Sequence, residues 1–135
     1  MDQVPLMEQI QKRISRSKSN VFIRKDFMGL GGYDQIGRAL RSLVADGKLV
    51  KVGYGVYVRA EPSSFTGNPV PTIPLMEIGL ETMEKLGIDA GVGRALRRYN
   101  QGESTQIPMK AILDVKGSRI VRQLGFGSKK IRYER

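Results

Sequence analysis

The stretch from Tyr33 to Val58 most constrains the fold, because it changes from the periodicity of a helix to that of two strands. Apolar residues recur at helical spacing over 33–46, and two β-prone runs, 48–52 and 56–60, follow almost at once. The two runs flank Gly53-Tyr54-Gly55, a composition typical of a tight hairpin turn. A helix that leads directly into a hairpin is an unusual unit, and its polar surfaces indicate what it contacts.

The helix predicted over 33–46 has two distinct sides. At about 100° per residue, its apolar residues cluster on one side: Ile36, Ala39, Leu40, Leu43 and Val44. The other side carries Asp34, Gln35, Arg38, Arg41, Ser42 and Ala45. Arginine pairs with guanine and glutamine with adenine in the DNA major groove, while small side chains permit close approach. We therefore predict four base-reading residues, with an ordinary solvated face as the alternative: Gln35, Arg38, Arg41 and Ser42.

The residues before this helix complete a known order of elements. A helix is predicted over 5–16, a short β-prone run over 21–23, and a short helix closed by glycines within 24–32. Together with the later helix and hairpin, this is the order of a winged helix-turn-helix. Residues placed to contact the DNA backbone from the short helix and the wing are Arg24, Lys25, Lys51 and Tyr54.

The distribution of charge favours a polyanionic partner. The chain has 23 Lys and Arg against 13 Asp and Glu, a net charge of +10. Residues 1–60 carry a net +6, residues 61–91 a net −4, and residues 92–135 a net +8. Such a chain is attracted to nucleic acid. Double-stranded DNA is favoured over RNA, because aromatic residues make up only 7% and do not alternate with basic ones.

The residue types that are absent argue against an enzyme. The chain has no cysteine and no histidine, so disulfides, thiol chemistry and the commonest general base and metal ligand are excluded. We therefore expect no catalytic residues, no cofactor and no metal. No apolar run is long enough to span a membrane, and the N-terminus lacks the features of a signal peptide. A cytoplasmic location is expected.

The second half of the chain predicts a smaller mixed lobe. The segment 61–74 contains four prolines and is predicted to be a linker. An amphipathic helix follows over 75–86, with a proposed core stripe of Leu75, Met76, Leu80, Met83 and Leu86. Strands are predicted within 104–115 and at 129–135, with helical turns near 119–125. The overall expectation is an α+β chain with a winged helix-turn-helix at 1–60, a linker at 61–74 and a small α/β domain at 75–135.

Two basic segments of the second half were considered as sites. A second basic patch, able to hold DNA or a protein partner, is predicted at Arg94, Arg97 and Arg98. The segment Gly125–Lys130, with the sequence GFGSKK, superficially resembles a phosphate-binding loop. It lacks the spacing of that motif, and a tight turn into a basic strand explains it.

Two stretches resemble one known family. Residues 31–60, GGYDQIGRALRSLVADGKLVKVGYGVYVRA, resemble the winged N-terminal domain of AbiE-type antitoxins of type IV toxin–antitoxin systems. Residues 95–108, ALRRYNQGESTQIP, resemble a stretch in the C-terminal part of the same group. The resemblance implies a DNA-binding transcriptional regulator that represses its own promoter, and a C-terminal part that counters a nucleotidyltransferase-like toxin. A homodimer is a further expectation. The alternative is a protein-interaction module that neutralises a toxin or other partner through its basic C-terminal lobe, with DNA binding secondary.

Overall fold

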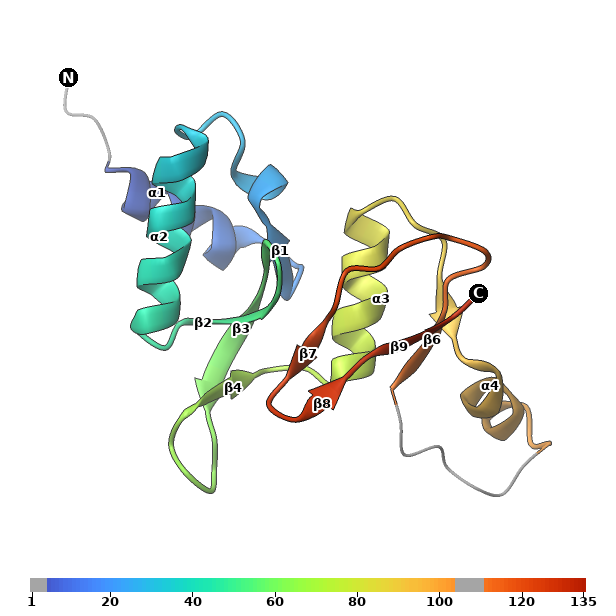
Figure 1. The fold of residues 1–135 in the computed structure, drawn as a ribbon. Coiled ribbons are helices and arrows are strands. Elements are labelled where there is room, and N and C mark those ends of the chain that lie inside the picture. The colour runs from blue at the N-terminus through green and yellow to red at the C-terminus, as the bar shows by residue number, and fades with distance from the viewer. Residues whose placement is uncertain (1–4, 104–110) are drawn as a thin grey trace. The chain divides into compact units, whose positions relative to one another are not determined.

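The computed structural model of the chain, which describes residues 5–103 and 111–135, is a mixed α+β protein (Figure 1). The predicted α+β class is confirmed. The chain divides into two compact units between Thr72 and Ile73. The first contains α1 (Leu6–Arg16), β1 (Val21–Ile23), the 3-10 helix η1 (Arg24–Phe27), α2 (Tyr33–Ala45), β2 (Leu49–Gly53), β3 (Val56–Pro62) and β4 (Pro69–Pro71). The second contains α3 (Leu75–Lys85), β5 (Gly91–Val92), α4 (Arg94–Asn100), β6 (Ile112–Asp114), β7 (Gly125–Phe126), β8 (Lys129–Lys130) and β9 (Arg132–Glu134).

The sheet of the first unit is antiparallel and has β3 at its centre, between β1 and β2. Tyr57 of β3 lies opposite Phe22 on one side and Lys51 on the other. Tyr54 and Gly55 form the turn between β2 and β3, and Gly55 adopts a left-handed backbone with φ +68°. The predicted hairpin is confirmed.

The end of α2 is set by Gly47. The Lys48 N–H donates to the Leu43 carbonyl at 2.9 Å, and the Gly47 N–H donates to the Val44 carbonyl at 3.0 Å. This pair of bonds is the Schellman motif, which needs a left-handed residue after the helix, and Gly47 has φ +76°. The motif turns the chain sharply into β2, so the helix leads into the hairpin without a loop.

One side of the sheet and the two helices enclose the core of the first unit. α1 passes behind α2 (Figure 1), and the buried cluster draws on both helices, η1 and the strands β1, β2 and β3. Its members are Ile10, Phe22, Phe27, Ile36, Ala39, Leu40, Leu43, Leu49 and Tyr57. The apolar side predicted for 33–46 is therefore confirmed, with Val44 half-buried at its edge.

The predicted linker at 61–74 is corrected by the structure. β3 continues to Pro62, and β4 pairs with it in the register Ala60↔Pro71, Glu61↔Val70 and Pro62↔Pro69. Proline lacks an N–H donor but is tolerated in an edge strand, so a proline-rich segment can still extend the sheet here. The first unit consequently ends at Thr72 instead of near residue 60.

In the second unit, α3 packs closely against β6 through Gly79. A Cβ atom added to Gly79 would lie 2.6 Å from Leu113 Cδ1 and 2.6 Å from Ile131 Cδ1. The residues of α3 that are buried are Ile78, Gly79, Thr82 and Met83. The predicted stripe is therefore wrong in part: Met83 is in the core, while Leu75, Met76, Leu80 and Leu86 are only half-buried. The predicted stripe leaves out Ile78, Gly79 and Thr82, which α3 buries beside Met83.

The remaining strands form a small sheet and a separate hairpin. β6 pairs antiparallel with β5 and parallel with β9, and β7 pairs antiparallel with β8. The strand predicted within 104–115 is found at β6, and residues 104–110 lie outside the described part. The helical turns predicted near 119–125 are wrong, because that segment is irregular up to β7.

Candidate nucleic-acid interface

All four predicted base-reading residues lie on the exposed face of α2. Gln35, Arg38, Arg41 and Ser42 alternate around the helix with the buried residues of the core. Within residues 5–103 and 111–135, no carboxylate forms an ion pair with Arg38 or Arg41. The positive charge of this face is therefore available to an anionic ligand.

Gly37 has no side chain, so the side chains of Arg24 and Arg41 both approach the surface of α2 above it. A Cβ atom added to Gly37 would lie 2.9 Å from Nη2 of Arg24 and 3.4 Å from Nη1 of Arg41. The Arg24 guanidinium also stacks on the Tyr33 ring, 4.1 Å from its centroid. Its Nε is buried without a hydrogen-bond partner. Two guanidinium groups thus share the surface above Gly37, and neither forms an ion pair with a described carboxylate, which favours a bound anion such as phosphate.

The tip of the β2–β3 hairpin contacts the start of α2. A hydrogen bond with the Tyr54 side chain raises the pKa of the Tyr33 phenol, and desolvation adds to the shift. Tyr54 is nevertheless 72% exposed and Tyr33 61% exposed. Lys51, which lies on β2 below the turn, is also exposed. We call these residues of α2, Arg24 and the hairpin the α2 face: Arg24, Tyr33, Arg38, Arg41, Lys51 and Tyr54.

Gln35 has a structural role that limits its use as a base reader. The Gly32 N–H donates to Oε1 of Gln35 at 3.0 Å, in the manner of a capping box at the start of α2. Reading adenine requires the amide oxygen as well as the amide nitrogen. Gln35 would have to give up its cap to make that contact, whereas the side chains of Arg38 and Ser42 form no such bond within the described residues.

A hollow of about 480 Å³ adjoins the Arg24–Tyr33 stack. It is mainly apolar and is lined by Arg24, Lys25, Met28, Gly29, Gly31, Tyr33 and Ile36. Lys25 stands at its edge with its side chain exposed. The predicted phosphate contacts Arg24 and Lys25 therefore border the same recess beside the first turn of α2.

The hairpin tip gives a direct test of backbone geometry. Gly55 has φ +68°, a conformation that costs about 1–2 kcal/mol for most residues and more for β-branched ones. Gly55→Val should lower the free energy of unfolding by about 1–3 kcal/mol, measured by urea unfolding. Gly55→Asn is the matched control, because asparagine tolerates left-handed angles. Equal stability of the two variants would contradict this account of the turn.

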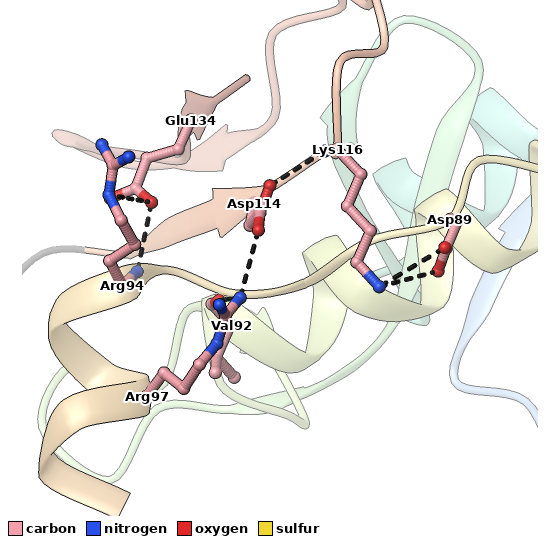
Figure 2. Close-up of polar contacts among 7 residues, drawn as sticks. All are labelled: Asp89, Val92, Arg94, Arg97, Asp114, Lys116 and Glu134. Carbon is pink, nitrogen blue, oxygen red and sulfur yellow. Dashed lines mark hydrogen bonds and ion pairs between the residues drawn. The ribbon is translucent and has the colours of Figure 1, made fainter.

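In the second unit, two of the three predicted patch arginines are held in internal ion pairs (Figure 2). Arg97 contacts Asp114 of β6 at 3.1 Å and donates to the Val92 carbonyl at 3.2 Å. Arg94 contacts Glu134 of β9 at 3.5 Å, and its backbone N–H donates to the same carboxylate at 3.1 Å. These contacts attach α4 to the sheet. The predicted second basic patch is revised accordingly, with only Arg98 left exposed and without an ion-pair partner among the described residues.

The pKa of Asp114 is held below its usual value by two donors. The larger effect comes from the Lys116 backbone N–H, which donates to the carboxylate at 2.9 Å, and Arg97 adds to it. A lowered pKa in the folded state stabilises the fold at neutral pH, and this contribution is lost as the pH falls through the folded pKa. The stabilisation from Asp114 therefore begins to fall near pH 4, where aspartate in an unfolded chain titrates.

The variant Asp114→Asn tests this linkage. The stability difference between the natural chain and Asp114→Asn should stay constant at neutral pH and shrink as the pH falls below about 4. Urea unfolding at a series of pH values measures it. If the stability difference does not change with pH, the negative charge of Asp114 does not contribute to stability.

The fold and this face together define a small basic α+β protein with an exposed arginine-bearing helix beside a hairpin. A family model matches residues 7–135, so the chain belongs to that family, which is described as a family of unknown function (DUF6088). No curated protein and no solved structure matches the chain. None of the described helices is both long and apolar enough to cross a membrane.

Proposed function

We propose that the protein is a sequence-specific double-stranded DNA-binding transcriptional regulator whose first unit acts as a winged helix-turn-helix. The order α1, β1, η1, α2, β2, β3 supports this proposal. In such a domain the second helix of the helix-turn-helix enters the major groove, and the hairpin contacts the backbone beside it. α2 takes the first role and the β2–β3 hairpin the second.

The observation that carries the proposal is the pair of exposed arginines on the α2 face. Arg38 and Arg41 are exposed on the side of α2 that faces away from the core, and neither forms an ion pair with a described carboxylate. Protein surfaces usually intersperse the two signs of charge. A helix face that presents arginine with small neighbours, next to an exposed tyrosine at a hairpin tip, suits the edges of base pairs and the flanking phosphates.

The geometry suggests a division of labour on this face. Arg38 forms no hydrogen bond or ion pair through its side chain with another described residue and is the principal base reader, with Ser42 beside it one helical turn further on. Arg41 shares the surface above Gly37 with Arg24, so this pair is suited to hold a phosphate or the acceptor edge of a guanine. Lys51 and Tyr54 contact the backbone from the hairpin, and Lys25 adds charge beside α2.

We propose further that the protein represses its own promoter as the antitoxin of a type IV, AbiE-like toxin–antitoxin system. The support is the resemblance of residues 31–60 and 95–108 to that group. The partner would then be a nucleotidyltransferase-like toxin encoded next to it. Co-expression of the neighbouring gene tests this role separately from DNA binding: growth arrest that this chain relieves supports it, and a neighbour with no effect on growth argues against it.

The DNA-binding proposal is tested by selecting duplexes from a random pool with the full chain, followed by footprinting on its own upstream DNA. We expect one enriched sequence and protection of a matching site in the upstream region. Two protected half-sites about one helical turn apart would indicate a dimer on the DNA. A pool that stays random after several rounds would reject sequence-specific binding.

A further inference from the structure

The β7–β8 hairpin presents exposed basic side chains that have no ion-pair partner among the described residues. Its turn consists of Gly127 and Ser128, and Gly127 adopts a left-handed backbone with φ +61°. The side chains of Lys129 and Lys130 follow and are exposed. Arg132, at the start of β9, is exposed as well.

The strands of this hairpin approach each other closely because of Gly125. A Cβ atom there would lie 3.1 Å from Lys130 Cα and would also collide with the Lys129 carbonyl oxygen. The backbone of β8 is therefore held tightly against β7, while its two lysine side chains extend into solvent.

The charges of the hairpin differ from those of α4. Arg94 and Arg97 are neutralised by Glu134 and Asp114. Lys129, Lys130 and Arg132, by contrast, have no ion-pair partner within the described parts of the chain. The sequence predicted the basic surface of the second half at Arg94, Arg97 and Arg98. Because two of these arginines form ion pairs, the unpaired basic side chains among the described residues include those of the hairpin.

We propose that the β7–β8 hairpin is a second DNA-contacting surface, which binds backbone phosphates and adds affinity without reading sequence. This inference rests on the proposed function of the first unit, since the ligand is the same duplex. Phosphate contacts in complexes come from Lys and Arg, Ser hydroxyls and backbone N–H groups, and these are the groups that the segment 127–132 exposes.

The composition of the hairpin favours a nucleic acid over a protein partner. Protein interfaces are depleted in lysine and serine and rely on buried aromatic or aliphatic side chains. The large apolar residues that are exposed among the described residues are Met28, Tyr33, Tyr54, Phe65 and Val121, and none lies in 125–132. Phe126 is half-buried. The hairpin therefore offers phosphate-binding groups without an apolar anchor for a protein surface.

The covalent connection makes a weak second contact effective. β4 ends at Pro71 and α3 begins at Leu75, so only a few residues join the units. A second site tethered by a short connection acts at a high effective concentration once the first site is bound. Modest phosphate contacts from the hairpin would thereby prolong the residence of α2 on the duplex.

The test compares two double variants of the full chain that remove equal charge. Lys129→Gln with Lys130→Gln alters the hairpin, and Lys12→Gln with Lys18→Gln alters exposed lysines of the first unit outside the α2 face. Binding to the selected duplex and to a random duplex is measured by fluorescence anisotropy between 50 and 200 mM salt. Thermal melting verifies that both variants fold.

The hairpin variant should weaken binding to both duplexes by a similar factor, on the order of tenfold at the lowest salt. The slope of log affinity against log salt concentration should be smaller in magnitude by about 1.8, because two phosphate contacts are lost at about 0.9 each. The control variant should change neither quantity appreciably. The ratio of affinities for the two duplexes should remain that of the natural chain.

The other outcomes separate this inference from the proposed function. If both variants behave alike, the hairpin is a solvated surface and the inference is overturned, while binding through α2 stands. If the hairpin variant keeps its DNA affinity but no longer binds an acidic polypeptide that the natural chain binds, the hairpin is a protein surface and the inference is again overturned. If the natural chain binds no duplex at all, both proposals fail together.

Discussion

Arg38→Ala and Arg41→Ala should each weaken binding to the selected duplex by about 1–3 kcal/mol, which is roughly 5- to 150-fold. Both side chains are exposed on α2 and pair with no described carboxylate, so their removal should leave the melting temperature almost unchanged. A bidentate contact to guanine is lost only on the correct sequence. Affinity for a random duplex should therefore fall much less, and the preference for the selected sequence should narrow.

The matched control for these variants is Arg16→Ala. Arg16 is exposed in the last turn of α1, outside the α2 face, and carries the same charge. It should produce a small loss that is equal on both duplexes. If all three variants lose the same affinity on the selected and random duplexes, α2 is not the reading helix.

Replacing Arg59 should have the largest effect on stability. Arg59 of β3 donates from Nη2 to the Ile14 carbonyl at 2.6 Å and to the Ser17 carbonyl at 2.7 Å. Its Nε donates to the Ser19 carbonyl at 3.2 Å, and its guanidinium lies 5.2 Å from the Phe22 ring centroid. Carbonyls at the end of a helix have no partner within it, and here one arginine satisfies those that connect α1 to the sheet.

Arg59→Met should lower the free energy of unfolding by about 2–4 kcal/mol, because charge-assisted hydrogen bonds to three carbonyls are lost, of which that of Ile14 keeps the Ser17 N–H as a donor. Methionine retains the apolar stem, so the loss reports mainly on the hydrogen bonds. Urea unfolding followed by far-ultraviolet circular dichroism measures it. Lys48→Met, an exposed change at a residue that lines the same surface hollow as Arg59, is the control and should alter stability by less than about 0.5 kcal/mol. If the two variants lose similar amounts of unfolding free energy, the hydrogen bonds of Arg59 do not stabilise the fold.

The elements that the sequence predicted well are those with regular periodicity. The helix at 33–46 and the hairpin after it agree with α2, β2 and β3 almost residue for residue, since both depend on local pattern and on Gly47 and Gly55. Glycines that act by close packing were missed. Gly37 and Gly79 add nothing to an apolar pattern, yet each is buried where another side chain approaches its helix.

The candidate site was predicted in composition but not in its contacts. The exposed positions of Arg38, Arg41 and Ser42 follow from the periodicity of α2. The capping by Gln35 was not detectable from the usual capping-box pattern, because Gly32 at the N-cap has no side chain to complete that pattern. The pairing of Arg97 with Asp114 and of Arg94 with Glu134 spans many residues, and no local pattern shows which basic groups a distant strand will neutralise.

The measurement that tests the central claim most directly is the mapping of backbone amides that change on DNA binding. At 15.0 kDa, the full chain suits nuclear magnetic resonance, and spectra are compared with and without the selected duplex. Binding through the α2 face should give the largest chemical-shift changes at the backbone amides of Tyr33–Ala45 and of the turn at Tyr54 and Gly55. Smaller chemical-shift changes at these amides are expected with a random duplex. Shifts that spare α2 and the hairpin tip, or that are the same for both duplexes, would contradict sequence recognition through this helix.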